Sequence, residues 1–238
     1  MRDKIKDRAY FETYIAEEEE SAEELKAFLE DNRDTGTDSD RIANIKAEID
    51  SIMFSIFKAK FSAGFDLEEI KTDFTQLVRD MPQYWHPLYG YMDILDRLSI
   101  AVMYDIDIEL WDILVQLVDD NDLGDWLVYF LIASKNEGIQ YEKYELKVKK
   151  PYKILMDFIR GNTNDAAILM KYLKDVWYKS NSDVGWYDSH KHWDNLYCGY
   201  WSWECGAIVK LLKVDDAELQ HLPFYPYDLV HYKDTPNV

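Results

Sequence analysis

The chain has 238 residues, of which 47% are apolar, so it is long enough to bury one large hydrophobic core or two smaller ones. Its 46 acidic side chains outnumber the 27 basic ones, and the net charge of −19 disfavours binding to DNA and anionic membranes while favouring a basic partner. The longest apolar run, WLVYFLIA from Trp126, is far shorter than the about 20 residues that a membrane span needs.

The first two predicted elements are long helices over residues 3–31 and 41–62. The polar stretch DNRDTGTDSD, residues 31–40, separates them, and Asp38, Ser39 or Asp40 can cap the second helix. The second helix carries apolar residues at helical spacing, namely Ile42, Ile45, Ile49, Ile52, Met53 and Ile56. We expect the two helices to form an antiparallel hairpin.

Further helices are predicted along the rest of the chain. One is capped by Asp66 and ends near Pro82 to Pro87. The others cover residues 88–103, 107–118, 122–135, 151–160, a segment capped by Asn162 or Asn164 and ending near residue 178, and 196–213. With no convincing strand pair, the sequence predicts an all-α multi-helix bundle of about nine or ten helices.

A polar, charged stretch, GIQYEKYELKVKKP from Gly138, indicates a connection between two helical halves. We therefore expect a domain over residues 1–137 and a second over 138–238, packed together. Cys198 and Cys205 would lie too far apart on one helix for a disulfide, and two free thiols fit a reducing compartment. The N-terminus lacks the apolar core of a secretory signal, so we expect a soluble, cytoplasmic protein.

The negative charge is unevenly distributed. Residues 66–125 contain fifteen acids and three bases, whereas residues 135–179 contain ten bases and six acids. Acidity that served only solubility would not segregate in this way, so the pattern indicates an electronegative binding face. The predicted face comprises Asp105, Asp107, Glu109, Asp112, Asp119, Asp120, Asp122 and Asp125.

Glu204 is a carboxylate among apolar residues. If residues 196–213 are helical, it lies in the same stripe as Trp201, Cys205 and Ile208. Burial would raise its pKa, as a general acid or base requires, but nothing in the sequence places a second catalytic group near it. A buried glutamate also needs a hydrogen-bonding partner, and we favour a structural anchor that ties the aromatic loop or the C-terminal tail to this helix.

An alternative hypothesis is a metal-dependent hydrolase. Asp188, His190, His192 and Asp194 lie close in sequence, and Cys198 could complete a zinc shell. In this alternative the site is centred on Asp188, His190, His192 and Glu204. Phosphate-binding glycine loops and the nucleophile elbow of hydrolases are absent from the sequence.

The final third of the chain, from WYDSHKHWDN through YPYDLVHY, resembles the C-terminal domain of the PoNi immunity proteins, and MRDKIKDRAYFETYIAEEEE resembles the start of their N-terminal domain. The residues that carry the resemblance are His190, Lys191, Tyr200, Trp201, Glu204, Asp215, Asp216, Tyr225, Pro226, Tyr227 and Asp228. Cys205 and Gly206 stand where small residues such as alanine are expected.

The resemblance implies an all-helical bacterial immunity protein, without catalysis or a cofactor, that binds a secreted DNase toxin. It also implies that the shared motif is structural, so the residues that select a toxin lie elsewhere. A DNase surface is basic because it holds phosphates, and an acidic face would be attracted to it. We expect no nucleic acid, membrane or small-molecule ligand. A helical scaffold with a non-toxin partner is the remaining alternative.

Overall fold

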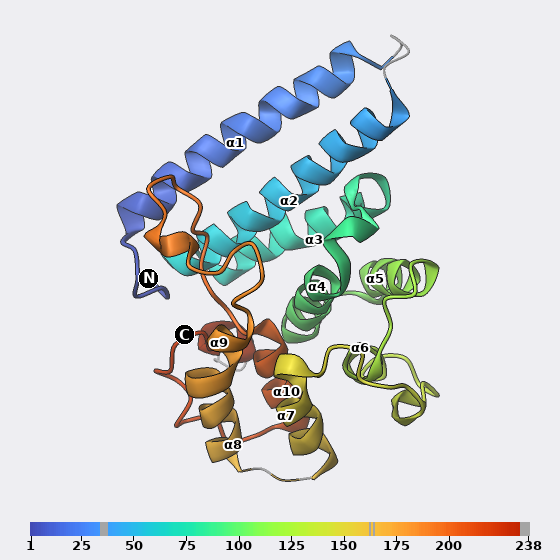
Figure 1. Cartoon of the computed structure of the whole chain (residues 1–238), viewed down its shortest axis with the longest axis vertical. Coiled ribbons are helices and arrows are strands. Elements are labelled where there is room, and N and C mark those ends of the chain that lie inside the picture. Colours follow the sequence, from blue (N-terminus) through green and yellow to red (C-terminus); the bar gives the residue numbers. More distant parts are fainter. Residues whose placement is uncertain (34–37, 162, 164, 234–238) are drawn as a thin grey trace. The chain divides into compact units, whose positions relative to one another are not determined.

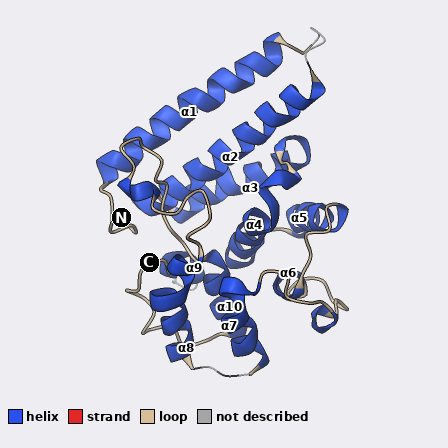
Figure 2. Cartoon of the chain, viewed as in Figure 1, coloured by secondary structure: helices blue, strands red, loops and turns tan. Residues whose placement is uncertain are grey.

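The computed structural model describes residues 1–33, 38–161, 163 and 165–233. Helices and loops account for all of this described part (Figure 2), and the predicted all-α class is confirmed. If α8, the π-helical turn η3 and α9 are counted as one element, the described residues form ten α-helices. The chain divides into two compact units, Met1–Leu88 with Asp188–Gly199 and Tyr89–Tyr187 with Tyr200–Val238. The domain boundary after residue 137 stays a prediction.

The first unit is built on three helices: α1 (Arg8–Asp31), α2 (Ser39–Ala63) and α3 (Leu67–Tyr84). Helix α2 packs against both α1 and α3, and the predicted hairpin of the first two helices is visible in Figure 1. The carboxylates of Asp7, Asp38 and Asp66 each accept hydrogen bonds from the first turn of the helix that follows. Residues 34–37 of the predicted loop lie outside the described residues.

The segment Asp188–Gly199 completes the first unit although it comes from the last third of the chain. The Tyr197 hydroxyl donates a 2.5 Å hydrogen bond to Asp3, and the Tyr197 amide donates to the Tyr10 hydroxyl at 3.0 Å. The Ser62 hydroxyl donates to the Cys198 carbonyl at 2.9 Å. Tyr197 is 1% exposed, so these bonds are part of a core shared by the two ends of the sequence.

The second unit surrounds α4 (Gly90–Tyr104), which follows the short 3-10 turn η1 (Pro87–Tyr89). Helix α4 packs against α5 (Ile108–Asp120), α6 (Trp126–Ile132), α10 (Trp203–Leu212) and α11 (Tyr227–Val230). Its Arg97 is fully buried and forms an ion pair with Asp93 at 2.8 Å. A Cβ atom on Gly206 of α10 would lie 2.7 Å from the Met103 sulfur, so glycine permits the close approach of α10 to α4.

The remaining elements of the second unit lie along residues 141–180. They are η2 (Tyr141–Lys143), α7 (Lys149–Arg160), α8 (Ala166–Lys171), the π-helical turn η3 (Tyr172–Trp177) and α9 (Tyr178–Ser180). The predicted caps Asn162 and Asn164 lie outside the described residues, and Asp165 caps α8. A further 3-10 turn, η4 (Ser189–Lys191), lies in the segment that joins the first unit.

Three predicted helices are clearly shorter in the structure. The helix predicted over 3–31 is α1, which begins at Arg8 after its cap Asp7. The helix predicted over 122–135 is α6, because Asp125 caps it and the chain turns after Ile132. The helix predicted over 196–213 is α10, which begins only at Trp203. Residues 197–202 are not helical, since the Ser202 amide donates instead to the Phe224 carbonyl at 2.7 Å. Trp201 therefore precedes the helix. None of the described helices is long and apolar enough to cross a membrane.

Candidate functional site

Helix α5 presents most of the predicted acidic face. It buries Leu110, Trp111, Leu114 and Val118, so residues on its opposite side point to solvent. Seven predicted acids are exposed on this side or in the flanking turns, and we call them the acidic stripe: Asp105, Asp107, Glu109, Asp112, Asp119, Asp120 and Asp122. The structure thus brings these seven residues onto one helix and its two ends.

The charges at the two ends of the acidic stripe are partly compensated. The Lys135 ammonium lies 2.6 Å from Asp105, and that of Lys147 lies 3.4 Å from Asp122. Both lysines come from the base-rich segment that the sequence separates from the acidic one. In the part of the chain that the structure describes, five acids form no ion pair, so uncompensated negative charge extends from the N-cap of α5 to its last turn: Asp107, Glu109, Asp112, Asp119 and Asp120.

Asp125, the eighth predicted face residue, does not lie on the surface. It is 1% exposed, and its carboxylate accepts hydrogen bonds from the amides of Val128 at 2.9 Å and Lys147 at 3.1 Å. Burial raises the pKa of Asp125, and the bond from the Val128 amide opposes that rise. Its physical role is to cap α6 and to hold the chain before α7, so we correct its assignment to the face.

Glu204 lies in the first turn of α10 and is 1% exposed, as expected for an anchor. Its Oε1 accepts hydrogen bonds from the Tyr172 hydroxyl at 2.6 Å and the Ser202 hydroxyl at 2.7 Å. These partners lie in η3 and next to α10, not in the aromatic loop or the tail as we predicted. Burial raises the pKa of Glu204, and the bonds from Ser202 and Tyr172 oppose the rise.

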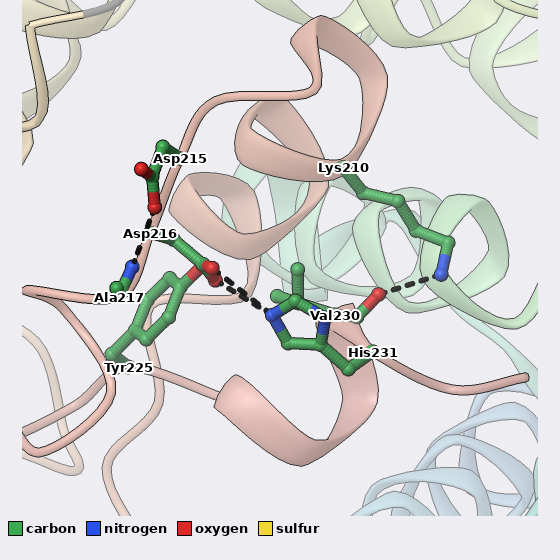
Figure 3. Close-up of polar contacts among 7 residues, drawn as sticks. All are labelled: Lys210, Asp215, Asp216, Ala217, Tyr225, Val230 and His231. Carbon is green, nitrogen blue, oxygen red and sulfur yellow. Dashed lines mark hydrogen bonds and ion pairs between the residues drawn. The ribbon is translucent and has the colours of Figure 1, made fainter. Parts of the chain in front are cut away.

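A second buried carboxylate, Asp216, holds the C-terminal tail (Figure 3). It accepts a short hydrogen bond from the Tyr225 hydroxyl, and the His231 Nε2 atom lies 3.0 Å from its Oδ1. The Lys210 ammonium of α10 donates to the Val230 carbonyl at 2.6 Å. These contacts attach α11 to α10 through polar groups that are satisfied within the unit.

Comparison with known families decides what kind of protein these features belong to. A model of PoNe immunity proteins (PoNi), N-terminal, matches residues 2–116, and one of PoNe immunity proteins (PoNi), C-terminal, matches residues 123–229. The chain belongs to the PoNi family. Membership indicates an immunity function against a toxin, and it favours a role that needs no catalysis.

The fold of this PoNi protein also occurs in a solved structure. The crystal structure of protein PA2201 from Pseudomonas aeruginosa superposes with a TM-score of 0.68, covering 97% of this chain and 89% of that chain. The two sequences are 18% identical, so the likeness concerns the fold alone. A search of curated proteins gave no match.

The residues that carry the PoNi resemblance are distributed over both units. His190 and Lys191 belong to the first unit, where the His190 ring lies 6.0 Å from that of Tyr197 and Lys191 pairs with Asp188 at 2.8 Å. The others belong to the second unit. Tyr225 donates a hydrogen bond to Asp216, and its ring lies next to that of Tyr227. Six of these residues are buried, namely Tyr200, Trp201, Glu204, Asp216, Tyr225 and Pro226, whereas Asp215 and Asp228 are exposed. The structural role of the shared motif stays a prediction, which the burial of about half of its residues favours.

The hydrolase hypothesis requires a cluster of metal ligands. Among residues 1–33, 38–161, 163 and 165–233, no three or more His, Cys, Asp or Glu side chains lie close enough to hold an ion. His192 lies 3.7 Å from Asp194, and Asp188 pairs with Lys191. Neither of the two donors to Glu204 was predicted. Ser202 is two residues away and could have been suspected, but nothing in the sequence indicates Tyr172.

Proposed function

We propose that this PoNi protein neutralises a DNase toxin of the PoNe type by placing the acidic stripe against the basic surface with which the toxin holds DNA phosphates. The observation that carries the proposal is the exposed row of acids along α5 and its N-cap, five of which form no ion pair in the described chain: Asp107, Glu109, Asp112, Asp119 and Asp120. A row of carboxylates carries negative charge, as the phosphates of a DNA strand do. The basic surface of an enzyme that binds phosphates therefore attracts it.

The stripe supports fast association more than high affinity. Exposed charges act over about one Debye length, near 8 Å at physiological salt, and orient a charged partner before contact. Affinity requires desolvated apolar anchors as well. Ile108 is 53% exposed beside Asp107 and Glu109, which makes it a candidate anchor within the stripe. A complete interface would engage about 20–30 residues a side, so the stripe is one part of it.

Charge reversal tests the proposal. The double variant Glu109→Lys/Asp112→Lys should lower the association rate constant with the toxin domain by about tenfold or more at low salt, and should flatten its dependence on ionic strength. Stopped-flow fluorescence measures both quantities. A matched control, Asp157→Lys/Asp175→Lys, makes the same charge change at exposed positions elsewhere in the second unit.

Equal association rates for the two double variants would remove the stripe from the interface. Protection of cells is a second readout, because the toxin domain should stop growth when expressed alone and should be tolerated with the wild-type protein. The Glu109→Lys/Asp112→Lys variant should protect less well than its control. If the wild-type protein neither binds the toxin domain nor protects, the proposed function itself is wrong.

A further inference from the structure

The first unit contains a pocket of about 360 Å³ on the surface of α2, between side chains of α1 and α3. Its apolar walls are Ile49 and Met53 of α2 and Leu77 of α3, and the Tyr84 side chain lies at the end of α3. Such walls can cover the methylene stem of a side chain, and an aromatic ring can stack on a planar cation. The pocket is therefore suited to an elongated guest with an apolar body.

The polar part of the lining is predominantly negative. Asp50, Asp73 and Asp80 contribute carboxylates, and Lys26 is the cation among the lining residues. Lys60 pairs with Asp73 at 2.9 Å, so part of the charge is compensated. Asp80 is exposed, and among the described residues only the neutral Gln76 amide donates hydrogen bonds to it, at 3.1 Å. A charged donor that entered the pocket could replace the neutral Gln76 amide as the hydrogen-bond donor to the Asp80 carboxylate.

Together, the apolar walls and the carboxylates select a particular kind of guest. A phosphate or carboxylate would be repelled, and a purely apolar side chain would exclude water from the carboxylates without supplying them a further donor. Lysine would offer a compact charge, whereas the arginine guanidinium is planar, weakly hydrated and able to donate to several oxygens at once. The side-chain amides of Gln76 and Gln83 add further acceptors to the lining.

We propose that this pocket receives an arginine side chain of the toxin. The inference rests on the proposed function for the identity of the partner, and it adds an anchor in the first unit to the charged stripe in the second. The two features have different kinetic roles. Exposed charges on the stripe govern the rate of encounter, whereas a side chain held in a lined pocket governs how long the complex lasts.

The chemistry of the pocket can be tested without the toxin. N-acetyl-arginine amide should shift the methyl resonance of Met53 in a titration of the full chain, and N-acetyl-citrulline amide, its uncharged isostere, should not. Asp80→Asn should weaken binding of the arginine probe by about tenfold, the loss expected for one charge-assisted hydrogen bond. Gln83→Glu should strengthen it. The matched control is Glu69→Gln, which removes one exposed charge from α3 outside the pocket.

Equal shifts with the arginine and citrulline probes, or equal binding to Asp80→Asn and Glu69→Gln, would overturn the assignment of a cation pocket. The toxin domain provides the second arm. Asp80→Lys should raise the dissociation rate constant by about tenfold or more, and Glu69→Lys, which makes the same charge change on α3, should leave dissociation unchanged. If Asp80→Lys leaves dissociation unchanged while the stripe variant still slows association, this inference fails and the proposed function stands.

Discussion

Replacing Glu204 should destabilise the protein, and the structure sets the size of the effect. Glu204→Ala removes the acceptor of the Tyr172 and Ser202 hydroxyls, which belong to two fully buried residues, and leaves both donors unpaired. Stranding each of the two buried donors costs about 1–3 kcal/mol, and losing one buried methylene adds about 0.8 kcal/mol. We therefore expect a loss of about 3–7 kcal/mol at pH 5, where the raised pKa leaves more of the carboxyl neutral than in an ordinary glutamate.

The cost of Glu204→Ala should fall as the pH rises. Burial raises the pKa of Glu204 above its ordinary value of 4.5, so the folded state holds the proton more tightly than the unfolded state. The stabilising contribution of the neutral carboxyl is complete below pH 4.5 and is lost as the pH rises through the folded-state pKa. Glu204→Gln, which stays neutral and keeps an acceptor oxygen, should therefore gain stability relative to the wild type between pH 4.5 and pH 8.

Urea unfolding followed by tryptophan fluorescence at pH 5 and pH 8 measures these differences. With a slope of about 1–3 kcal/mol per molar urea, Glu204→Ala should lower the midpoint at pH 5 by about 1 M or more. The Gln variant serves as the control for side-chain volume. The reasoning is refuted if Glu204→Ala has the wild-type midpoint at pH 5, or if the difference between wild type and Glu204→Gln is the same at both pH values.

Two further substitutions test the second unit. Gly206→Ala should cost about 1–3 kcal/mol despite the better helix propensity of alanine, because the new methyl group overlaps α4 and the tail; a urea midpoint at or above that of the wild type would show that the helices can move apart. Asp125→Ala should cost about 1–2 kcal/mol through loss of the α6 cap, also measured by urea unfolding, and should leave the rate of toxin association at the wild-type value. A slower association would return Asp125 to the binding face.

The helical class and several helix starts could be predicted because their signals are local. Asp66 precedes an apolar row at helical spacing, and the structure uses its carboxylate as a cap for two amides. Likewise, the acids of α5 alternate with buried positions, so their exposure follows from the period of a helix. Both the helix start at Asp66 and the exposure of the α5 acids are therefore determined by residues that are close in sequence.

The errors arise where distant segments determine the conformation. Trp201 fits the helical spacing of α10, but the pairing of the Ser202 amide with the Phe224 carbonyl keeps its segment out of the helix. Asp125 looks like another surface acid in an acidic run, and only the bond from Lys147 shows that a later segment covers it. The Tyr172 donor to Glu204 lies in a π-helical turn that no short pattern predicts.

The return of residues 188–199 to the N-terminal helices affects how these proteins can exchange parts during evolution. A chimaera joined between the two family-matched regions would combine Asp3 and Ser62 of one parent with Tyr197 and Cys198 of another. Recombination at that junction would therefore disrupt the packing of residues 188–199 on the N-terminal helices. New toxin specificities should arise more readily by substitution of exposed side chains than by shuffling whole halves.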